Sequence, residues 1–201
     1  MDYYFVKDYK KDYRFFSSQP FHEIEVNFTK LRQRWEEAKR RLMLLPQRIL
    51  SQEQAFERAV SLKEFRIKIH YSGSKEKSRI KKKFTFFLLK QRSKHILFLI
   101  IETLLLPVSG LMAFLPGPNI FFYVLALIMY TQWKALRGIK VLIKKDHEFI
   151  DSPLLKEWEA AVESGKPEEM QAAMKKINDG LCIDKIQKIL YKQKEKHTSH
   201  S

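Results

Sequence analysis

The stretch ILFLIIETLLLPVSGLMAFLPGPNIFFYVLALIMYTQW, residues 96–133, decides how the rest of the chain can fold. Its only formal charge is Glu102. An apolar run of about 18 residues or more with few charges is typical of a membrane-spanning helix. This stretch is roughly twice that length, so it is long enough for two spans.

A break divides the stretch in the middle. A helix does not continue undisturbed through Pro116–Pro118, because proline removes a backbone donor and clashes with the preceding turn. We therefore expect two apolar helices, over about 96–115 and from Asn119 to 133 or slightly beyond, with Asn119 as N-cap of the second. The turn between them consists of Pro116, Gly117, Pro118 and Asn119.

Basic residues flank this hairpin on both sides. Nine Lys or Arg and one acid, Glu76, lie between Lys75 and Lys94, and five more cations follow in 134–145. Positive charge marks the cytoplasmic or matrix side of a membrane, so both termini are expected there. The pattern predicts an integral protein of a bacterial or mitochondrial inner membrane, with a two-span transmembrane hairpin over 96–138. The alternative is a buried hairpin at the centre of a soluble helical protein.

Side chains next to the hairpin fit a membrane interface. Tyr130 and Trp133 are placed for an aromatic belt, and Lys134 and Arg137 can extend to the interface. The segment 75–95 is expected either as an interfacial amphipathic helix or as an extension of the first membrane helix. Small residues that allow close helix packing are Ser109, Gly110 and Ala113. Cations placed to contact anionic head groups are Lys81, Lys82, Lys83, Lys90, Arg92 and Lys94.

The remaining sequence predicts a mainly α protein with amphipathic cytosolic helices and a short β element. The alternation in 64–71 (EFRIKIHY) predicts a strand, whose partner is either the region of Val6 or 23–26. The aromatic-rich N-terminus is expected as a strand or as an interfacial arm. Helices are expected over about 30–45, over 55–62 after a capping box at 51–54, and over 153–164, 167–179 and 183–191. The expected divisions are 1–74 (soluble, helical with strands), 75–95 (basic), 96–138 (hairpin), 139–191 (soluble, helical) and 192–201 (disordered tail).

The net charge of +15 indicates attraction to polyanions. The basic residues gather beside the apolar stretch, which favours a bilayer with anionic head groups over nucleic acid. Cys182 is the only cysteine, so an intramolecular disulfide is excluded. The sequence carries no enzyme signature, cofactor motif or metal-ligand spacing, so we expect no enzymatic activity, no cofactor and no metal.

Glu102 is the residue best suited to ion chemistry. A carboxyl group in lipid has a raised pKa and can exchange protons near neutral pH. The broken backbone at Asn119 could line a cation path. The alternatives are a shallow Glu102 paired with Lys94 or Arg137, and a Pro-Gly-Pro segment that is only a turn.

Residues 115–142, LPGPNIFFYVLALIMYTQWKALRGIKVL, resemble the signature of the mitochondrial potassium/proton exchange-related family. The likeness rests on the PGPN-type turn, on an aromatic-rich second helix, and on a W-x-A-L-x-G segment that ends at Gly138. The family's second helix often carries an arginine, and a histidine before the Trp, whereas 129–132 has neither. Residues that carry the likeness in the second helix are Phe121, Phe122, Tyr123, Tyr130, Trp133, Ala135 and Leu136.

The resemblance implies a role in potassium/proton exchange across an inner membrane, as a transporter subunit or an accessory factor. It implies potassium ions and protons as the ions involved. Two helices seldom enclose an ion path, so a transporter would be a homo-oligomer or would need a partner membrane protein. The rival functions are a membrane-anchored adaptor or scaffold without transport activity, and a soluble polyanion-binding protein.

Overall fold

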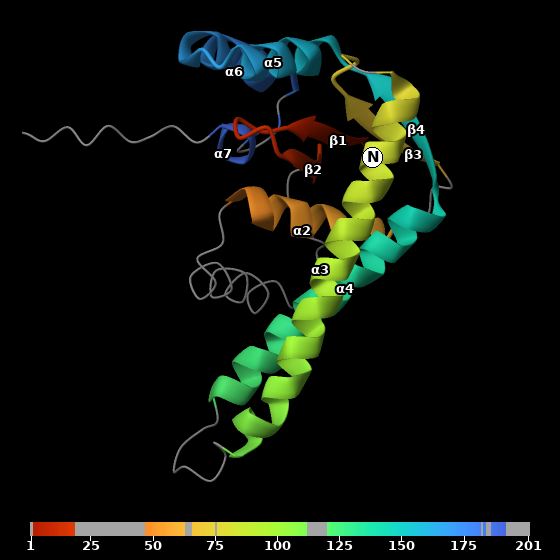
Figure 1. The fold of residues 1–201 in the computed structure, drawn as a ribbon, viewed down its shortest axis with the longest axis vertical. Coiled ribbons are helices and arrows are strands. Elements are labelled where there is room, and N and C mark those ends of the chain that lie inside the picture. Colours follow the sequence, from red (N-terminus) through yellow and green to blue (C-terminus); the bar gives the residue numbers. More distant parts are fainter. Residues whose placement is uncertain are drawn as a thin grey trace, which may run out of the picture. The chain divides into compact units, whose positions relative to one another are not determined.

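The computed structural model describes residues 2–18, 47–62, 66–74, 76–111, 120–181, 183 and 186–191. The chain divides into two compact units, one formed by Met1–Gln52, Lys68–Lys75 and Phe149–Ser201, the other by Glu53–Ile67 and Glu76–Glu148. We call them the sheet unit and the helical unit. Elements in chain order are β1 (Asp2–Lys7), β2 (Tyr13–Ser17), α2 (Gln47–Ala59), β3 (Arg66–Tyr71), α3 (Lys77–Leu111), α4 (Ile120–Lys144), β4 (Asp146–Asp151), α5 (Pro153–Ser164), α6 (Pro167–Leu181) and α7 (Ile186–Leu190) (Figure 1).

The sheet unit is built on a mixed sheet in the strand order β2-β1-β3-β4. β1 runs antiparallel to β2, with Tyr4 opposite Phe16, and parallel to β3, with Tyr3 opposite Ile69. Nearly every residue of β1 is buried, as expected for a central strand covered on both faces. The aromatic N-terminus is therefore a strand, and this strand, the region of Val6, is a partner of β3.

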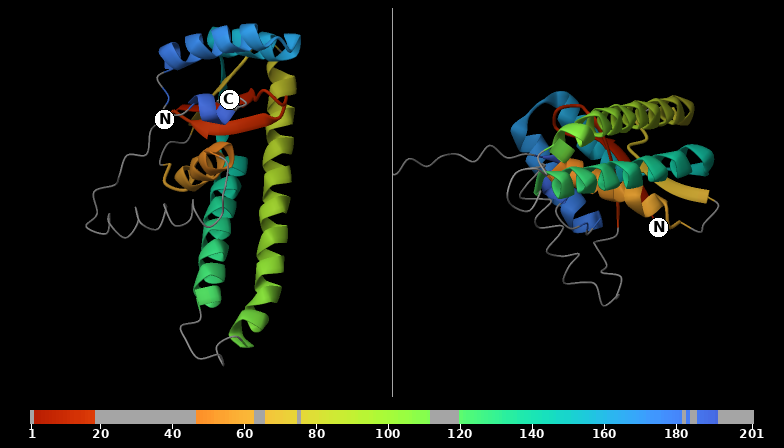
Figure 2. Two further views of the ribbon diagram at one scale, coloured as in Figure 1. Left: turned by 90° about the vertical axis from the view of Figure 1, so that its left-hand side faces the viewer. Right: turned by 90° about the horizontal axis from the view of Figure 1, so that it is seen from below.

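Helices α5 and α6 cover one face of β1 and β2, as two views show (Figures 1 and 2). Trp158 is fully buried there beside Tyr4 and Ile177, and its indole N–H donates to the carbonyl oxygen of Lys7 at 2.8 Å. Pro153 opens α5 and Gly165 ends it with a φ of 73°, which is a left-handed conformation that glycine adopts without strain. The predicted helix over 153–164 is confirmed.

In the helical unit, α3 and α4 lie side by side and run in opposite directions (Figure 2). The N-terminal part of α3 and the C-terminal part of α4 bury apolar side chains. These are Ile80, Phe84 and Leu88 of α3 and Ile139 and Leu142 of α4. The α3 residues recur every four positions, which places them on one helix face. The basic segment before the apolar stretch and the start of that stretch form one continuous helix, α3.

The predicted two-span transmembrane hairpin is wrong. Among the described residues, no helix combines the length and the apolar character that crossing a membrane requires. The physical reason is that α3 and α4 mix polar and apolar segments. Cations continue along α3 as far as Lys94, with Glu102 beyond them, and α4 carries Gln132, Lys134 and Arg137. The mainly α prediction is also wrong, because the fold contains a four-stranded sheet.

Smaller differences concern the ends of elements. α2 begins at Gln47, so Ser51 lies within the helix and does not cap it. β4 was not predicted, because DHEFID shows only two apolar side chains among charged ones. α6 passes through Gly180 to Leu181. Predictions outside the described residues are the helix over 30–45, the strand at 23–26, Ala113, the turn Pro116–Asn119 and the tail 192–201.

Candidate functional site: a polar seam and an apolar end on α3 and α4

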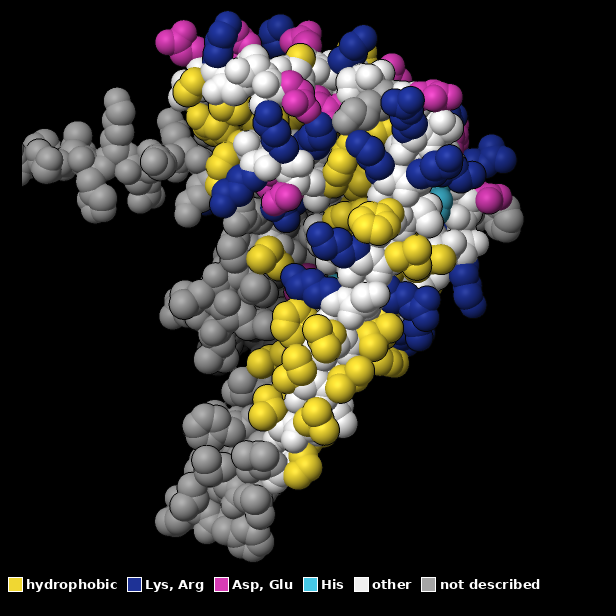
Figure 3. Space-filling view, viewed as in Figure 1, with side chains coloured by type: hydrophobic (Ala, Val, Ile, Leu, Met, Phe, Trp, Pro, Cys, Tyr) yellow, Lys and Arg dark blue, Asp and Glu magenta, His cyan; other side chains and the backbone are white. Residues whose placement is uncertain are grey.

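The part of α3 beyond His95 exposes apolar side chains almost all around the helix. Leu97 is 57% exposed and Leu104 71% exposed. Figure 3 shows these side chains gathered over the lower half of α3, with cations over the upper half. A contiguous apolar patch of this kind marks an interaction surface. We call it the apolar end, and define it as Leu97, Phe98, Ile100, Ile101, Leu104 and Leu105 of α3 with Tyr130 and Trp133 of α4.

Cations surround the apolar end where it meets the rest of the helical unit. Arg137 lies 4.9 Å from the ring centre of Trp133, and Lys134 lies 4.9 Å from that of Tyr130. These are cation–π contacts one helical turn apart. The six cations predicted to meet head groups are all exposed on α3. Arg137 and Lys140 of α4 are exposed as well. We call these eight cations the basic belt: Lys81, Lys82, Lys83, Lys90, Arg92 and Lys94 of α3 with Arg137 and Lys140 of α4.

Lys134 is held more firmly than its neighbours. Its ammonium forms an ion pair with Glu57 of α2 at 2.7 Å. Burial alone would lower the pKa of Lys134, but the hydrogen bond and the charge of Glu57 outweigh it and the pKa is raised. Lys134 therefore stays charged and fixes the aromatic Tyr130 beside it.

A polar seam lies between the two helices, under the apolar end. Its members are His95, Glu102 and Gln132, each no more than 8% exposed. The His95 ring donates a hydrogen bond through Nδ1 to the side-chain oxygen of Gln132 across the seam. His95 also meets the ring of Phe56 edge-on at 6.2 Å. Burial lowers the pKa of His95, and the hydrogen bond to Gln132 opposes this shift only in part.

Glu102 lies two helical turns beyond His95 on the same face of α3. Its Oε2 atom is buried and has no hydrogen-bond partner among the described residues. Burial raises the pKa of Glu102, because removal of water disfavours the charged form. No ion pair joins it to Lys94 or Arg137 within the described part of the chain.

The other predicted site residues are placed as follows. Ser109 and Gly110 lie in the last turns of α3. Asn119 and the turn before it lie outside the described residues. Sequence reasoning missed His95, although its seven-residue spacing from Glu102 places both on one helix face. It also missed Gln132, because only the packing of α4 on α3 brings this side chain to His95.

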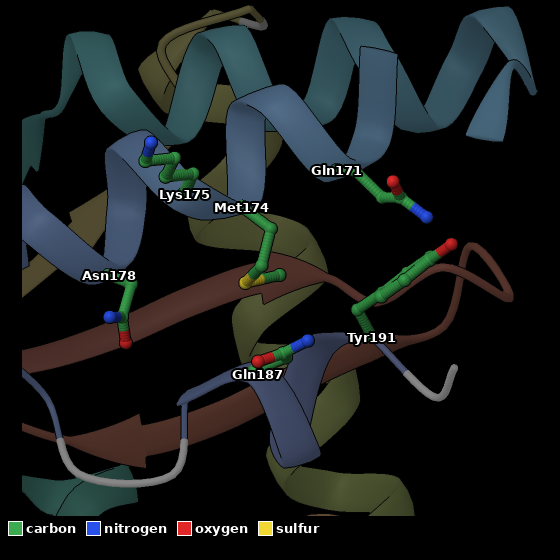
Figure 4. Close-up of a pocket in the computed structure, with 6 residues that line it drawn as sticks. All are labelled: Gln171, Met174, Lys175, Asn178, Gln187 and Tyr191. Carbon is green, nitrogen blue, oxygen red and sulfur yellow. The ribbon is translucent and has the colours of Figure 1, made fainter. Parts of the chain in front are cut away.

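The sheet unit contains a pocket. It is an open pocket of about 300 Å³ beside α6 and α7. Figure 4 shows Met174 above Gln187, with Lys175 pointing away from them. The lining residues are Gln171, Met174, Lys175, Asn178, Gln187 and Tyr191. Three of these six side chains are carboxamides, and the described residues hold no cluster of three side chains that could bind a metal ion.

Comparison with known protein families gives a match that covers more than half of the chain. A family described as mitochondrial K⁺-H⁺ exchange-related matches residues 10–145. This range contains the described residues of α2, α3 and α4, and with them the polar seam, the apolar end and the basic belt. No curated protein and no solved structure matches the chain.

Proposed function

Because the chain belongs to the mitochondrial K⁺-H⁺ exchange-related family, we propose that it serves this exchange as an accessory factor docked on the anionic surface of the inner membrane. The family description supplies the process and the mitochondrion. The helical unit supports the mode of action, through the apolar end and the basic belt beside it.

The apolar end is the observation that carries the proposal. Complete burial of a Leu, Ile or Phe side chain contributes about 1.5–3 kcal/mol. The six α3 side chains of the apolar end are 40–71% exposed, so covering what remains exposed would contribute roughly 1 kcal/mol each. Each cation near an anionic surface adds about 1 kcal/mol. Together these contributions are enough for stable attachment to the near leaflet without crossing the bilayer.

The positive charge of the basic belt favours an anionic lipid surface as the partner of the apolar end. A second copy of the chain would bring two basic belts together, which is repulsive for a protein of net charge +15. An anionic lipid surface is complementary to the belt and offers hydrocarbon to the apolar side chains. The cation–π pairs of Tyr130 and Trp133 lie at the boundary, where amphipathic aromatic side chains favour a membrane interface.

The polar seam argues for an accessory role over an ion path formed by this chain alone. His95 and Gln132 bond to each other across the seam, so their hydrogen-bonding groups serve the helix contact. An ion path needs polar groups that stay open to the ion. This bonding between His95 and Gln132 supports the proposal that a partner membrane protein forms the path.

Flotation with vesicles tests the docking. Wild-type protein is expected to float with vesicles of phosphatidylglycerol and phosphatidylcholine, and far less with phosphatidylcholine alone. The double variant Leu97→Glu/Leu104→Glu places two charges in the apolar end and should lose at least tenfold in vesicle affinity. The matched control Gln171→Glu/Asn178→Glu adds the same charge to the exposed surface of α6 and should bind like wild type. Equal flotation of the two double variants would contradict docking through the apolar end.

Ion flux tests the accessory role. Potassium-dependent proton flux should rise when the purified protein is added to inner-membrane vesicles that lack it, and the Leu97→Glu/Leu104→Glu variant should not restore it. Liposomes that hold only this protein should show no flux. Flux in those liposomes would overturn the accessory role and assign the path to this chain.

A further inference from the structure

Among the described residues of the apolar parts of α3 and α4, Glu102 is the only acidic or basic side chain. No other Asp, Glu, Lys, Arg or His occurs in the described residues from Ile96 to Leu111 of α3 or from Ile120 to Gln132 of α4. Any proton that this region gains or loses near neutral pH therefore belongs to Glu102.

The surroundings of Glu102 already exclude most water. The residue is 8% exposed, and its Oε2 atom has no hydrogen-bond partner in the described part of the chain. Exposed apolar neighbours stand one position before it and two after it, at Ile101 and Leu104. If lipid covers these neighbours, the remaining access of water to the carboxyl group is lost.

We propose that Glu102 takes up a proton when the apolar end docks on the membrane, so that attachment is coupled to proton binding. The inference rests on the proposed docking function and adds the ligand that regulates it. In the free protein the carboxylate retains some hydration. In the docked protein only the neutral carboxylic acid is compatible with its surroundings, because an isolated ionised group is costly in hydrocarbon.

The sign of the linkage follows from proton counts. The docked state binds more protons than the free state at pH values between the two pKa values of Glu102. Membrane affinity therefore falls as pH rises through that window, by up to about tenfold per pH unit for one proton. Burial already raises the pKa of Glu102 in the free protein. Docking would bury the carboxyl group further and raise its pKa more.

Neighbouring groups do not reproduce this behaviour. On α4, the charged residue nearest in sequence to the seam residue Gln132 is Lys134, which is paired with Glu57. On α3, the nearest titratable group is His95, whose pKa burial lowers; Glu53 of α2 and Lys94 also act on it. Further desolvation would make His95 release a proton, so docking driven through His95 would strengthen as pH rises. The two residues thus predict opposite pH dependences.

The test measures vesicle affinity between pH 5 and pH 8 for wild type, Glu102→Gln and the control Glu157→Gln. Glu157 lies on α5 and is paired with Lys176 at the surface. Wild type and Glu157→Gln should lose affinity as pH rises, by up to about tenfold per unit within the window. Glu102→Gln, which cannot ionise, should bind at every pH as tightly as wild type binds at low pH.

A direct measurement counts the proton. When protein and phosphatidylglycerol vesicles are mixed in a weakly buffered solution with a pH indicator, wild type should take up about one proton more per docked molecule than Glu102→Gln. A second variant, Glu102→Leu, should take up as few protons as Glu102→Gln. Agreement between the two variants would show that the result does not depend on the amide group that Gln introduces. Flotation of wild type with no pH dependence, or an unchanged dependence in Glu102→Gln, refutes proton coupling and leaves docking in place. Absence of wild-type flotation at every pH refutes both.

Discussion

Replacing Gly138 by alanine should separate two helices that now touch through their backbones. An ideal Cβ atom on Gly138 of α4 would lie 1.7 Å from the carbonyl oxygen of Phe56 and 2.5 Å from its carbonyl carbon, in α2. Ordinary contact begins at 3.4 Å, so the backbones would have to move apart by about 1.7 Å. Phe56 is fully buried, and forcing extra volume into such a site costs about 1–3 kcal/mol or more. Alanine gains about 1 kcal/mol of helix propensity over glycine, so the net loss of unfolding free energy is expected to be about 2 kcal/mol.

Urea unfolding followed by circular dichroism measures this loss. Gly180→Ala is the matched control, because Gly180 is also helical but its Cβ would meet only the end of the Leu154 side chain, at 2.6 Å. That side chain can move, so the control should lie within about 1 kcal/mol of wild type on the balance of propensity and repacking. If Gly138→Ala were as stable as Gly180→Ala, the close approach of α4 to α2 would be refuted.

Three further outcomes follow from other contacts. Gln132→Met removes the partner of the buried His95 and should cost about 1–3 kcal/mol in urea unfolding; a neutral result would contradict the seam. Trp158→Phe leaves the Lys7 carbonyl without its indole donor and should cost a similar amount, with loss of hydrogen-exchange protection in α5; unchanged protection would argue against the bond. Burial lowers the pKa of both His95 and His147 below 6.5. Below pH 6.5 the unfolded chain therefore binds more protons than the folded chain. The unfolding free energy should fall as pH drops from 6.5 through the lowered pKa values of the two histidines. His147→Gln should reduce that slope in pH-dependent unfolding, and an unchanged slope would exclude His147 as a contributor.

Part of the fold was predictable from local sequence signals. The alternation of Ile67, Ile69 and Tyr71 predicted β3, and Pro153 with Gly165 fixed both ends of α5, because these signals act within a few residues. β4 was not predictable in this way. Its burial comes from its place in the sheet, where Phe149 packs edge-on against Tyr71 at 6.2 Å, and no pattern within DHEFID reports that contact.

The candidate site was likewise predictable only where local sequence signals report it. Glu102 stood out because a carboxyl group among apolar residues is conspicuous in any sequence. Tyr130, Trp133, Lys134 and Arg137 were predicted as interface anchors, and the structure places them in cation–π contact. The transmembrane prediction relied on hydropathy summed along 96–133, which does not tell whether apolar side chains face a membrane core or form one surface of a mixed helix.

The two halves of α3 differ in the side chains that they bury, although Phe86 in the first half is also exposed. Up to Leu88, apolar Ile80 and Phe84 face inward and cations face outward, which is the arrangement that water favours. From His95 onward, His95 and Glu102 are buried, whereas Leu97 and Leu104 are exposed. Water does not stabilise that second arrangement, since it exposes apolar surface and removes hydration from polar groups. It becomes favourable only where the surroundings are themselves apolar, and the change occurs where the basic belt ends. On the proposed docking, a single helix would span the boundary between water and an apolar partner, and the position of Glu102 beyond that boundary would make the helix responsive to protons.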